Sequence, residues 1–235
     1  KEVNNNSVKI YNSLFKDIGY VEISGASEGK NLIGNKVAIE NSKFNKIISV
    51  TGANTLKGNV INNTVTMKDS GFGNVGGIFG GYTRVGDALN NVVNIKDCVL
   101  NKREGTQYIS GGRTRNGNAN NNVVVVSNTT FSSQVSINGG DADSGDSLGN
   151  VVTIHGNTKF MEDGYVTAGS VLTVDAKAYN NTVNLISIST DGLKDVNVFG
   201  GFKTHGGPLY GGASTPNTLN IKDVGNGTKI SQIGG

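Results

Sequence analysis

The 235-residue chain has little of several residue types that define common protein classes. Its single cysteine, Cys98, excludes an intramolecular disulfide framework and zinc clusters of the CxxC type. Two prolines beside 35 glycines exclude collagen and proline-rich disorder. No stretch approaches the roughly 18 uninterrupted apolar residues of a membrane-spanning helix. We therefore expect that this segment does not insert into a membrane.

Charge of one sign is not concentrated in any part of the sequence. The formal net charge is +3 at pH 7, and the lysines are interspersed without a dense basic run. This pattern favours neither nucleic acid nor an anionic membrane as a partner. The sequence shows no signal peptide and no initiating methionine, and the repeat described next reaches from Lys1 to Gly235. We expect a single domain over 1–235 that is a fragment of a longer protein.

The sequence does contain a repeated pattern, Asn-x-(Val/Leu)-x-(Ile/Val/Leu/Met), which occurs eight times. The first apolar positions of successive copies are 28 to 36 residues apart. Self-similarity at such a period is typical of solenoids and arrays. An asparagine begins every copy: Asn6, Asn35, Asn63, Asn91, Asn122, Asn150, Asn181 and Asn217.

Each repeat has three strand-like parts and no helical period. The pattern itself alternates apolar and polar residues, as a strand does. A polar corner with an inward Phe or Leu follows, and then a second strand that ends in small residues, usually Gly-Gly. A short third element precedes the next asparagine. These parts predict an all-β fold, a right-handed parallel β-helix (solenoid) of about eight rungs with three short strands per rung.

Stacking of the rungs makes two further predictions. The eight asparagines lie one above another, as an internal or corner ladder whose amides bond along the axis. Length varies mainly between the Gly-Gly bend and the third element, in the segments 113–121, 141–146 and 202–216. Variable loops over a constant core are where solenoids place binding.

The segment Gly145-Asp146-Ser147-Leu148 matches the nucleophile box of the GDSL esterases. An esterase needs this serine after a strand of an α/β sheet, with a downstream His and Asp. In another repeat the same place reads Gly86-Asp87-Ala88-Leu89, with alanine in place of the serine. We therefore interpret the motif as a repeat variant and predict no catalytic residues.

Asp141, Asp143 and Asp146 lie close together in a Gly-rich loop. Carboxylates at alternating positions can converge on calcium, but the closing glutamate of an EF-hand loop is absent. A solvated acidic loop is the favoured interpretation, and this segment is a weak candidate for calcium. The histidines His155 and His205 fall in different parts of the repeat, which does not favour a shared metal or acid–base site. We expect no cofactor.

Basic and aromatic residues near the bends are the candidate binding residues. Stacked loops would align arginines, Arg84 among them, as a basic patch for anionic glycans. Exposed aromatic side chains such as Tyr82 are common contacts for sugars and proteins. The predicted binding residues are Arg103, Arg113, Arg115, Phe202, His205 and Tyr210.

With this repeat, the chain resembles the passenger region of type V autotransporters, in particular the long repetitive adhesins of fusobacteria and related Gram-negative bacteria. The resemblance covers the whole chain and rests on repeat style. It implies a right-handed β-helix on the bacterial cell surface, anchored by an outer-membrane barrel outside this segment. It also implies attachment to a host-cell protein or glycan, or to another bacterium.

The expected function is thus that of a non-enzymatic adhesin or stalk segment. One alternative is a β-helical polysaccharide lyase or hydrolase, which needs carboxylates or basic residues converging on one groove, often two acids about 5–9 Å apart. Asp and Glu in this repeat occur mainly in loops and corners, without a repeated inward cluster. A toxin-like autotransporter passenger is the other alternative.

Overall fold

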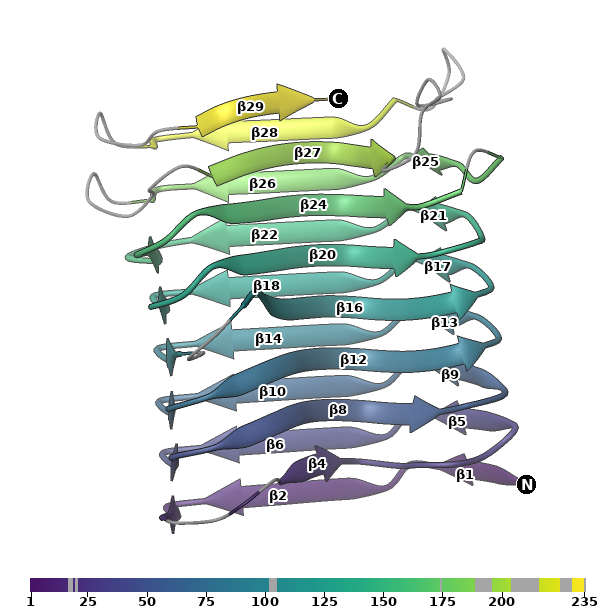
Figure 1. Ribbon diagram of the computed structural model, residues 1–235, viewed down its shortest axis with the longest axis vertical. Coiled ribbons are helices and arrows are strands. Elements are labelled where there is room, and N and C mark those ends of the chain that lie inside the picture. The colour runs from purple at the N-terminus through teal and green to yellow at the C-terminus, as the bar shows by residue number, and fades with distance from the viewer. Residues whose placement is uncertain are drawn as a thin grey trace.

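The computed structural model describes residues 1–16, 19, 21–101, 105–173, 175–188, 196–203, 216–224 and 230–234. Parallel strands from successive repeats stack into a β-helix whose turns follow one another along the long axis of the molecule (Figure 1). These residues include no helix long and apolar enough to cross a membrane. The predicted fold class is confirmed.

The repeated asparagine pattern forms the first sheet of the coil, which we call the entry sheet. Its register pairs the same position of each repeat, so that Val65 lies between Val37 and Val93. The entry sheet contains β2 (Ser7–Tyr11), β6 (Lys36–Glu40), β10 (Thr64–Lys68), β14 (Val92–Lys96), β18 (Val123–Ser127), β22 (Val151–His155), β26 (Thr182–Ile186) and β28 (Thr218–Lys222).

The polar corner contains a short strand that the sequence did not predict, and these strands form the corner sheet. Each has two residues, and the second is the inward Phe or Leu. The rings stack along the axis: the centroids of Phe44 and Phe72 are 5.2 Å apart and their planes differ by 5°. The corner sheet contains β3 (Leu14–Phe15), β7 (Lys43–Phe44), β11 (Gly71–Phe72), β15 (Val99–Leu100), β19 (Thr130–Phe131) and β23 (Lys159–Phe160).

The strands that run through the Gly-Gly bend form the long sheet. Its strands are β4 (Glu22–Ser24), β8 (Ile47–Thr55), β12 (Val75–Val85), β16 (Gln107–Asn116), β20 (Val135–Ala142), β24 (Gly164–Val171), β27 (Val196–Lys203) and β29 (Ile230–Gly234). The predicted second strand is therefore present, but several copies continue past the two glycines instead of ending there.

The third element of each repeat forms the closing sheet, as predicted. Its strands are β1 (Glu2–Asn4), β5 (Asn31–Ile33), β9 (Asn59–Ile61), β13 (Ala88–Leu89) and β17 (Ala119–Asn120), followed by the pair β21 (Ser147–Leu148) and β25 (Ala178–Tyr179). Six turns contain an entry, a corner, a long and a closing strand. The last two described turns contain an entry strand and a long strand each, so the number of complete turns is slightly below the predicted eight rungs.

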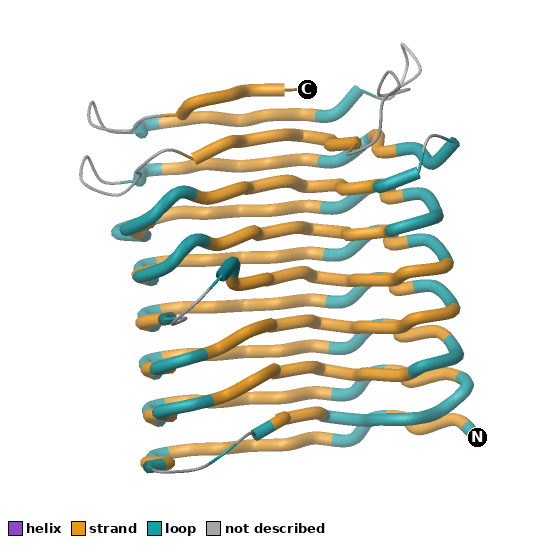
Figure 2. Tube along the Cα trace, viewed as in Figure 1, coloured by secondary structure: helices purple, strands orange, loops and turns teal. Residues whose placement is uncertain are grey.

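The coil is right-handed. In Figure 1 the entry strands run behind the molecule from right to left, and the long strands run in front from left to right, while the chain rises from the N-terminus. Loops and turns gather at the two edges between the stacked strands (Figure 2). This leaves the outer faces of the entry and long sheets as two broad surfaces of stacked strands.

The interior is divided into a large apolar cluster and smaller ones. The large cluster joins the inward Val and Ile residues of the entry sheet, the Phe and Leu residues of the corner sheet and the inward residues of the long sheet. The smaller clusters line the closing sheet, with Leu32, Val60 and Ala88 in one, and Ala119 and Ala178 in another. Small side chains there bring the closing strands close to the bend.

The predicted asparagine ladder is internal from Asn35 to Asn181, and the amides of these members are hydrogen-bonded at both their oxygen and their nitrogen. The Nδ2 group of Asn91 donates to Asn122 Oδ1 at 3.1 Å and to the Val60 carbonyl at 3.0 Å. The Asn91 Oδ1 accepts two hydrogen bonds from Asn63, one from its backbone N–H and one from its Nδ2, both at 3.0 Å. The same bonds recur in neighbouring turns, and Asn35 to Asn181 of the ladder are buried.

The polar corners after the entry strands turn through a left-handed residue. Asn41, Asp69 and Asp97 have φ between 46° and 52°, where Asn and Asp are tolerated better than most residues. The next residue points inward and bonds along the axis, as in the 3.1 Å bond from the Ser42 N–H to the Ser70 hydroxyl. Cys98 takes this position in its turn, as its place in the repeat indicated. Burial raises the pKa of the Cys98 thiol to about 11.

Candidate functional site

The candidate site lies on the outer face of the long sheet and depends on the Gly-Gly bend. Gly80 and Gly81 are both buried, which breaks the in–out alternation of β12. Phe79 before them and Tyr82 after them therefore project on the same outer side, with ring centroids 5.7 Å apart. Phe199 and Phe202 repeat this arrangement in β27, at 4.9 Å.

Close packing explains why the bend uses glycine. A Cβ on Gly80 would lie 2.4 Å from the Gly111 carbonyl oxygen of the next turn. A Cβ on Gly81 would lie 2.8 Å from both the Asn91 amide carbon and Val60. The bend thus rests directly on the asparagine ladder, and the ladder holds the outer face in shape.

Parallel register arranges the outward residues of the long sheet in columns along the axis. One column precedes the bend, with Ser24, Thr51, Phe79, Ser110, Asn138, Thr167 and Phe199. Another follows the bend, with Asn54, Tyr82, Arg113, Asp141, Ser170 and Phe202. A third, two residues before the first, includes Tyr108, Ser136 and Tyr165.

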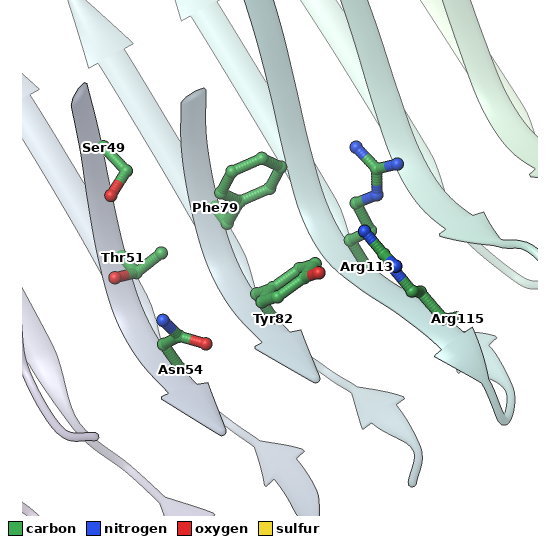
Figure 3. Close-up of a pocket in the computed structure, with 7 residues that line it drawn as sticks. All are labelled: Ser49, Thr51, Asn54, Phe79, Tyr82, Arg113 and Arg115. Carbon is green, nitrogen blue, oxygen red and sulfur yellow. The ribbon is translucent and has the colours of Figure 1, made fainter. Parts of the chain in front are cut away.

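Three cavities between these columns make up what we call the longitudinal groove. Its first part, of about 480 Å³, is lined by Glu22, Ser24, Ser27, Glu28, Asn54, Thr55 and Leu56. Its middle part, of about 260 Å³, is lined by Ser49, Thr51, Asn54, Phe79, Tyr82, Arg113 and Arg115 (Figure 3). Asn54 lines both, so the two parts adjoin.

The last part of the groove, of about 220 Å³, is shared between β16, β20, β24 and β27. Arg113 lines it as well as the middle part. The other lining residues are Tyr108, Ser136, Asn138, Asp141, Asp143, Tyr165, Thr167, Ser170, Leu172, Phe199 and Phe202. The groove therefore follows the axis of the coil from β4 to β27.

An ion pair between Arg113 and Asp141 lies between the middle and last parts of the groove. Arg113 Nε lies 3.4 Å from Asp141 Oδ2, and the Asp141 side chain is 14 % exposed. Burial raises the pKa of Asp141, and Asp143 raises it further, while Arg113 and a hydrogen bond from Ser170 oppose the rise. The Arg113 guanidinium also lies 5.8 Å from the centre of the Tyr108 ring, within reach of a cation–π contact.

The structure brings several predicted binding residues together. Arg113 and Arg115 both line the middle part, and Phe202 lines the last part. Arg103, His205 and Tyr210 lie outside the described residues. The site is placed on a sheet face, whereas the sequence pattern pointed to the variable loops.

Many groove residues were not predicted from the sequence. Phe79, Tyr108 and Tyr165 are outward aromatic side chains on the strand before or at the bend. Their signal was an aromatic residue at an outward position of a strand whose other outward residues are Ser, Thr or Asn. This signal indicates a binding surface only when the structure shows that residues before and after the Gly-Gly bend project on the same outer side.

The three aspartates proposed for calcium do not share one site. Asp141 pairs with Arg113, and Asp146 Oδ1 accepts the backbone N–H of Lys177 at 2.9 Å. The described residues contain no group of three or more His, Cys, Asp or Glu side chains placed to hold a metal ion. Asp146 belongs to a column of Asn and Asp side chains that each bind the backbone of the next turn.

Ser147 of the GDSL-like motif is an interior residue. It is fully buried, its hydroxyl donates to the Gly140 carbonyl at 3.0 Å, and it accepts a hydrogen bond from Asn150 Nδ2. Its partner in the next turn is Ala178, and Ala88 and Ala119 pair at the same position in earlier turns. The hydroxyl is thus part of the packing, consistent with its interpretation as a repeat variant.

The fold places the protein in the class of right-handed parallel β-helices. Comparison with protein-family models, with curated proteins and with solved structures gives no match.

Proposed function

We propose that this chain is a non-enzymatic adhesin or stalk segment of a bacterial surface protein of the autotransporter passenger type. In this proposal it binds ligands of a host cell or of another bacterium through the longitudinal groove. The supporting observation is the groove itself, which carries aromatic side chains and hydrogen-bonding side chains over successive turns.

The chemistry of the groove suits a glycan. Phe79, Tyr82 and Tyr108 offer aromatic faces with an apolar body, on which the C–H side of a sugar ring packs. The partly exposed Ser49 and Asn54 offer donors and acceptors for sugar hydroxyls. The extended shape along the axis matches a chain ligand better than a compact one.

The rigid frame supports the same function. Every turn between the first and the last is held by backbone pairing on both sides and by the asparagine ladder. Side chains fixed by such a frame lose little conformational freedom when a ligand binds, and preorganisation of this kind favours affinity.

Two matched variants test whether the groove is the binding surface. Ser136→Trp fills the last part of the groove, and Thr153→Trp adds the same bulk to the outer face of the entry sheet. Each of these residues lies outward and accepts one asparagine hydrogen bond. The purified chain and both variants would be measured on a glycan array and on host cells.

We expect the wild type and Thr153→Trp to bind alike and Ser136→Trp to lose binding. Equal binding by both variants would contradict the groove as the site. If the chain binds neither glycans nor cells while the full-length protein does bind, this segment is only a stalk.

Cleavage of a polysaccharide is a second candidate function, and one observation favours it. Asp141 and Asp143 line the same cavity as Arg113, and Asp141 has a raised pKa because it is buried. An assay on a panel of polysaccharides addresses this candidate. Cleavage that is lost in Asp141→Asn or Asp143→Asn would establish it and overturn the non-enzymatic proposal.

A further inference from the structure

The middle part of the longitudinal groove has an unbalanced charge. Its lining includes the guanidinium groups of Arg113 and Arg115 and no carboxylate. Arg113 forms an ion pair with Asp141, whereas Arg115 has no ion pair within the described residues. In Figure 3 both arginines extend from β16 beside the rings of Phe79 and Tyr82.

A third arginine, Arg84, lies next to Arg115 and adds to the positive charge beside the middle part. The register pairs Thr83 with Thr114 and Val85 with Asn116, so Arg84 and Arg115 are neighbours on adjacent strands. Both side chains are exposed and on the outer side. Like charges directly opposite each other across two strands destabilise the sheet, and a bound anion relieves that repulsion.

The parts of the groove on either side carry the opposite sign. The first part is lined by Glu22 and Glu28, without a basic residue. The last part is lined by Asp141 and Asp143 against the single cation Arg113. Adjacent strands are about 4.8 Å apart, which is less than the Debye length of about 8 Å at physiological salt. The flanking carboxylates therefore act on any ligand that extends beyond the middle part.

We propose that the middle part is a subsite for one acidic sugar within an otherwise neutral glycan. This inference rests on the proposed function. The sugar carries a carboxylate or sulfate that binds Arg115, with Arg113 beside it, and its ring packs on Tyr82 and Phe79.

Each feature of the subsite has a role in this recognition. A guanidinium presents a planar fork of donors that matches a carboxylate or a sulfate. Ser49 and Asn54 lie across the cavity from the arginines, where they can contact the sugar hydroxyls (Figure 3). The acidic flanks exclude a polyanion, since its further charges would lie against Glu22, Glu28, Asp141 or Asp143.

Calorimetric titration of the whole chain with four defined oligosaccharides tests this subsite. Two carry a single acid, namely 3′-sialyllactose and a lactosamine capped with one glucuronic acid. Lactose is the neutral counterpart, and a heparin-derived hexasaccharide is the polyanion. Arg115→Gln removes the free guanidinium. Lys36→Gln removes one charge from an exposed residue of β6 on the opposite sheet and serves as the control.

We expect at least one single-acid oligosaccharide to bind about tenfold more tightly than lactose, since one charge-assisted hydrogen-bonded contact is worth about a factor of ten or more. Arg115→Gln should remove this advantage, and Lys36→Gln should retain it. The heparin hexasaccharide should bind more weakly than the single-acid ligand at physiological salt. Tighter binding of the sialyl or of the glucuronyl compound shows which acidic sugar the subsite prefers, and either preference supports the subsite.

Three results would overturn the acidic subsite. They are equal binding of lactose and both single-acid compounds, an unchanged preference in Arg115→Gln, and tighter binding of the heparin hexasaccharide. In each case the chain still binds a sugar, so the proposed function survives. Absence of binding to every oligosaccharide and to cells is a different result, which contradicts the proposed function itself.

Discussion

At the scale of single residues, the buried asparagines hold the coil together because each one supplies hydrogen-bond partners for the asparagine of the neighbouring turn. Asn122 Oδ1 accepts both the backbone N–H and the Nδ2 of Asn91, and its own Nδ2 donates to the Ala88 carbonyl. A side chain that lacks either the oxygen or the NH₂ group leaves some of these groups without partners. Buried polar groups without partners each cost about 1–3 kcal/mol.

Asn122→Ala should therefore destabilise the protein by about 3 kcal/mol or more, because it orphans two donors of Asn91 and one carbonyl. The matched control is Asn184→Ala. Asn184 also bonds along the axis, to Thr153, but it lies on the outer face of the entry sheet and is only half-buried. We expect a loss below about 1 kcal/mol there. Urea unfolding of both variants measures this, and equal losses would contradict the role of the internal ladder.

Asp141 makes the stability depend on pH. Its pKa in the folded protein is raised above the ordinary value of 3.8, chiefly by burial. The folded protein therefore keeps this proton at pH values where the unfolded chain has lost it. The associated stability is fully present below the unfolded pKa and is lost as the pH rises through the folded pKa.

Asp141→Asn lacks this titration. The free energy of unfolding of the variant minus that of the wild type should therefore increase from pH 3 to pH 7, because only the wild type loses stability as Asp141 titrates. Urea unfolding of both proteins at pH 3, 5 and 7 measures the difference. A difference that stays constant or falls with pH would show that burial does not dominate at Asp141.

At the scale of elements, a column of glycines lets β8, β12 and β16 of the long sheet turn into the closing strands that follow them. Gly58, Gly86 and Gly117 have φ between 133° and 151°, a region that side chains rarely adopt. The carbonyl of Gly58 accepts a 2.8 Å hydrogen bond from the Thr83 hydroxyl, and Gly86 accepts one from Thr114. These two hydrogen bonds tie the turns at Gly58 and Gly86 to the long sheet.

Gly86→Ala should destabilise the protein by at least about 2 kcal/mol, because the backbone angle is strained for alanine. Its Cβ would also lie 2.2 Å from the Gly58 carbonyl oxygen. Gly71→Ala is the control, since a Cβ there meets nothing closer than 3.9 Å and the paired positions hold Lys43 and Val99. Thermal unfolding compares the two, and a harmless Gly86→Ala would contradict the tight stacking of these turns.

Some strands could be predicted from the sequence and others could not. The entry strands and the asparagine ladder were predictable because every copy keeps Asn and two apolar residues at fixed spacing. The corner strands were not, because two residues such as Lys43 and Phe44 have no periodicity of their own. Their pairing arises from stacking of the rings in successive turns.

At the scale of the whole molecule, the fold was predictable and the groove was only partly so. The arginines Arg113 and Arg115 were candidates because they cluster next to the Gly-Gly bend. Tyr108 and Tyr165 were not, because their importance depends on which columns face the same side after the bend. Columns of this kind join residues about 30 apart in the sequence, and a single repeat does not reveal them.

Tyrosine resonances test most directly whether a ligand binds in the longitudinal groove on one outer face of the molecule. In the chain labelled with ¹³C at its tyrosine rings, Tyr82, Tyr108 and Tyr165 report on the groove. Tyr11 and Tyr179 lie on the entry and closing strands and report on other surfaces. The measurement is the NMR titration of this sample with the oligosaccharide that binds most tightly on the array. We predict saturable shifts of the groove tyrosines while Tyr11 and Tyr179 stay unchanged. Shifts confined to Tyr11 or Tyr179 would show that the ligand binds outside the groove.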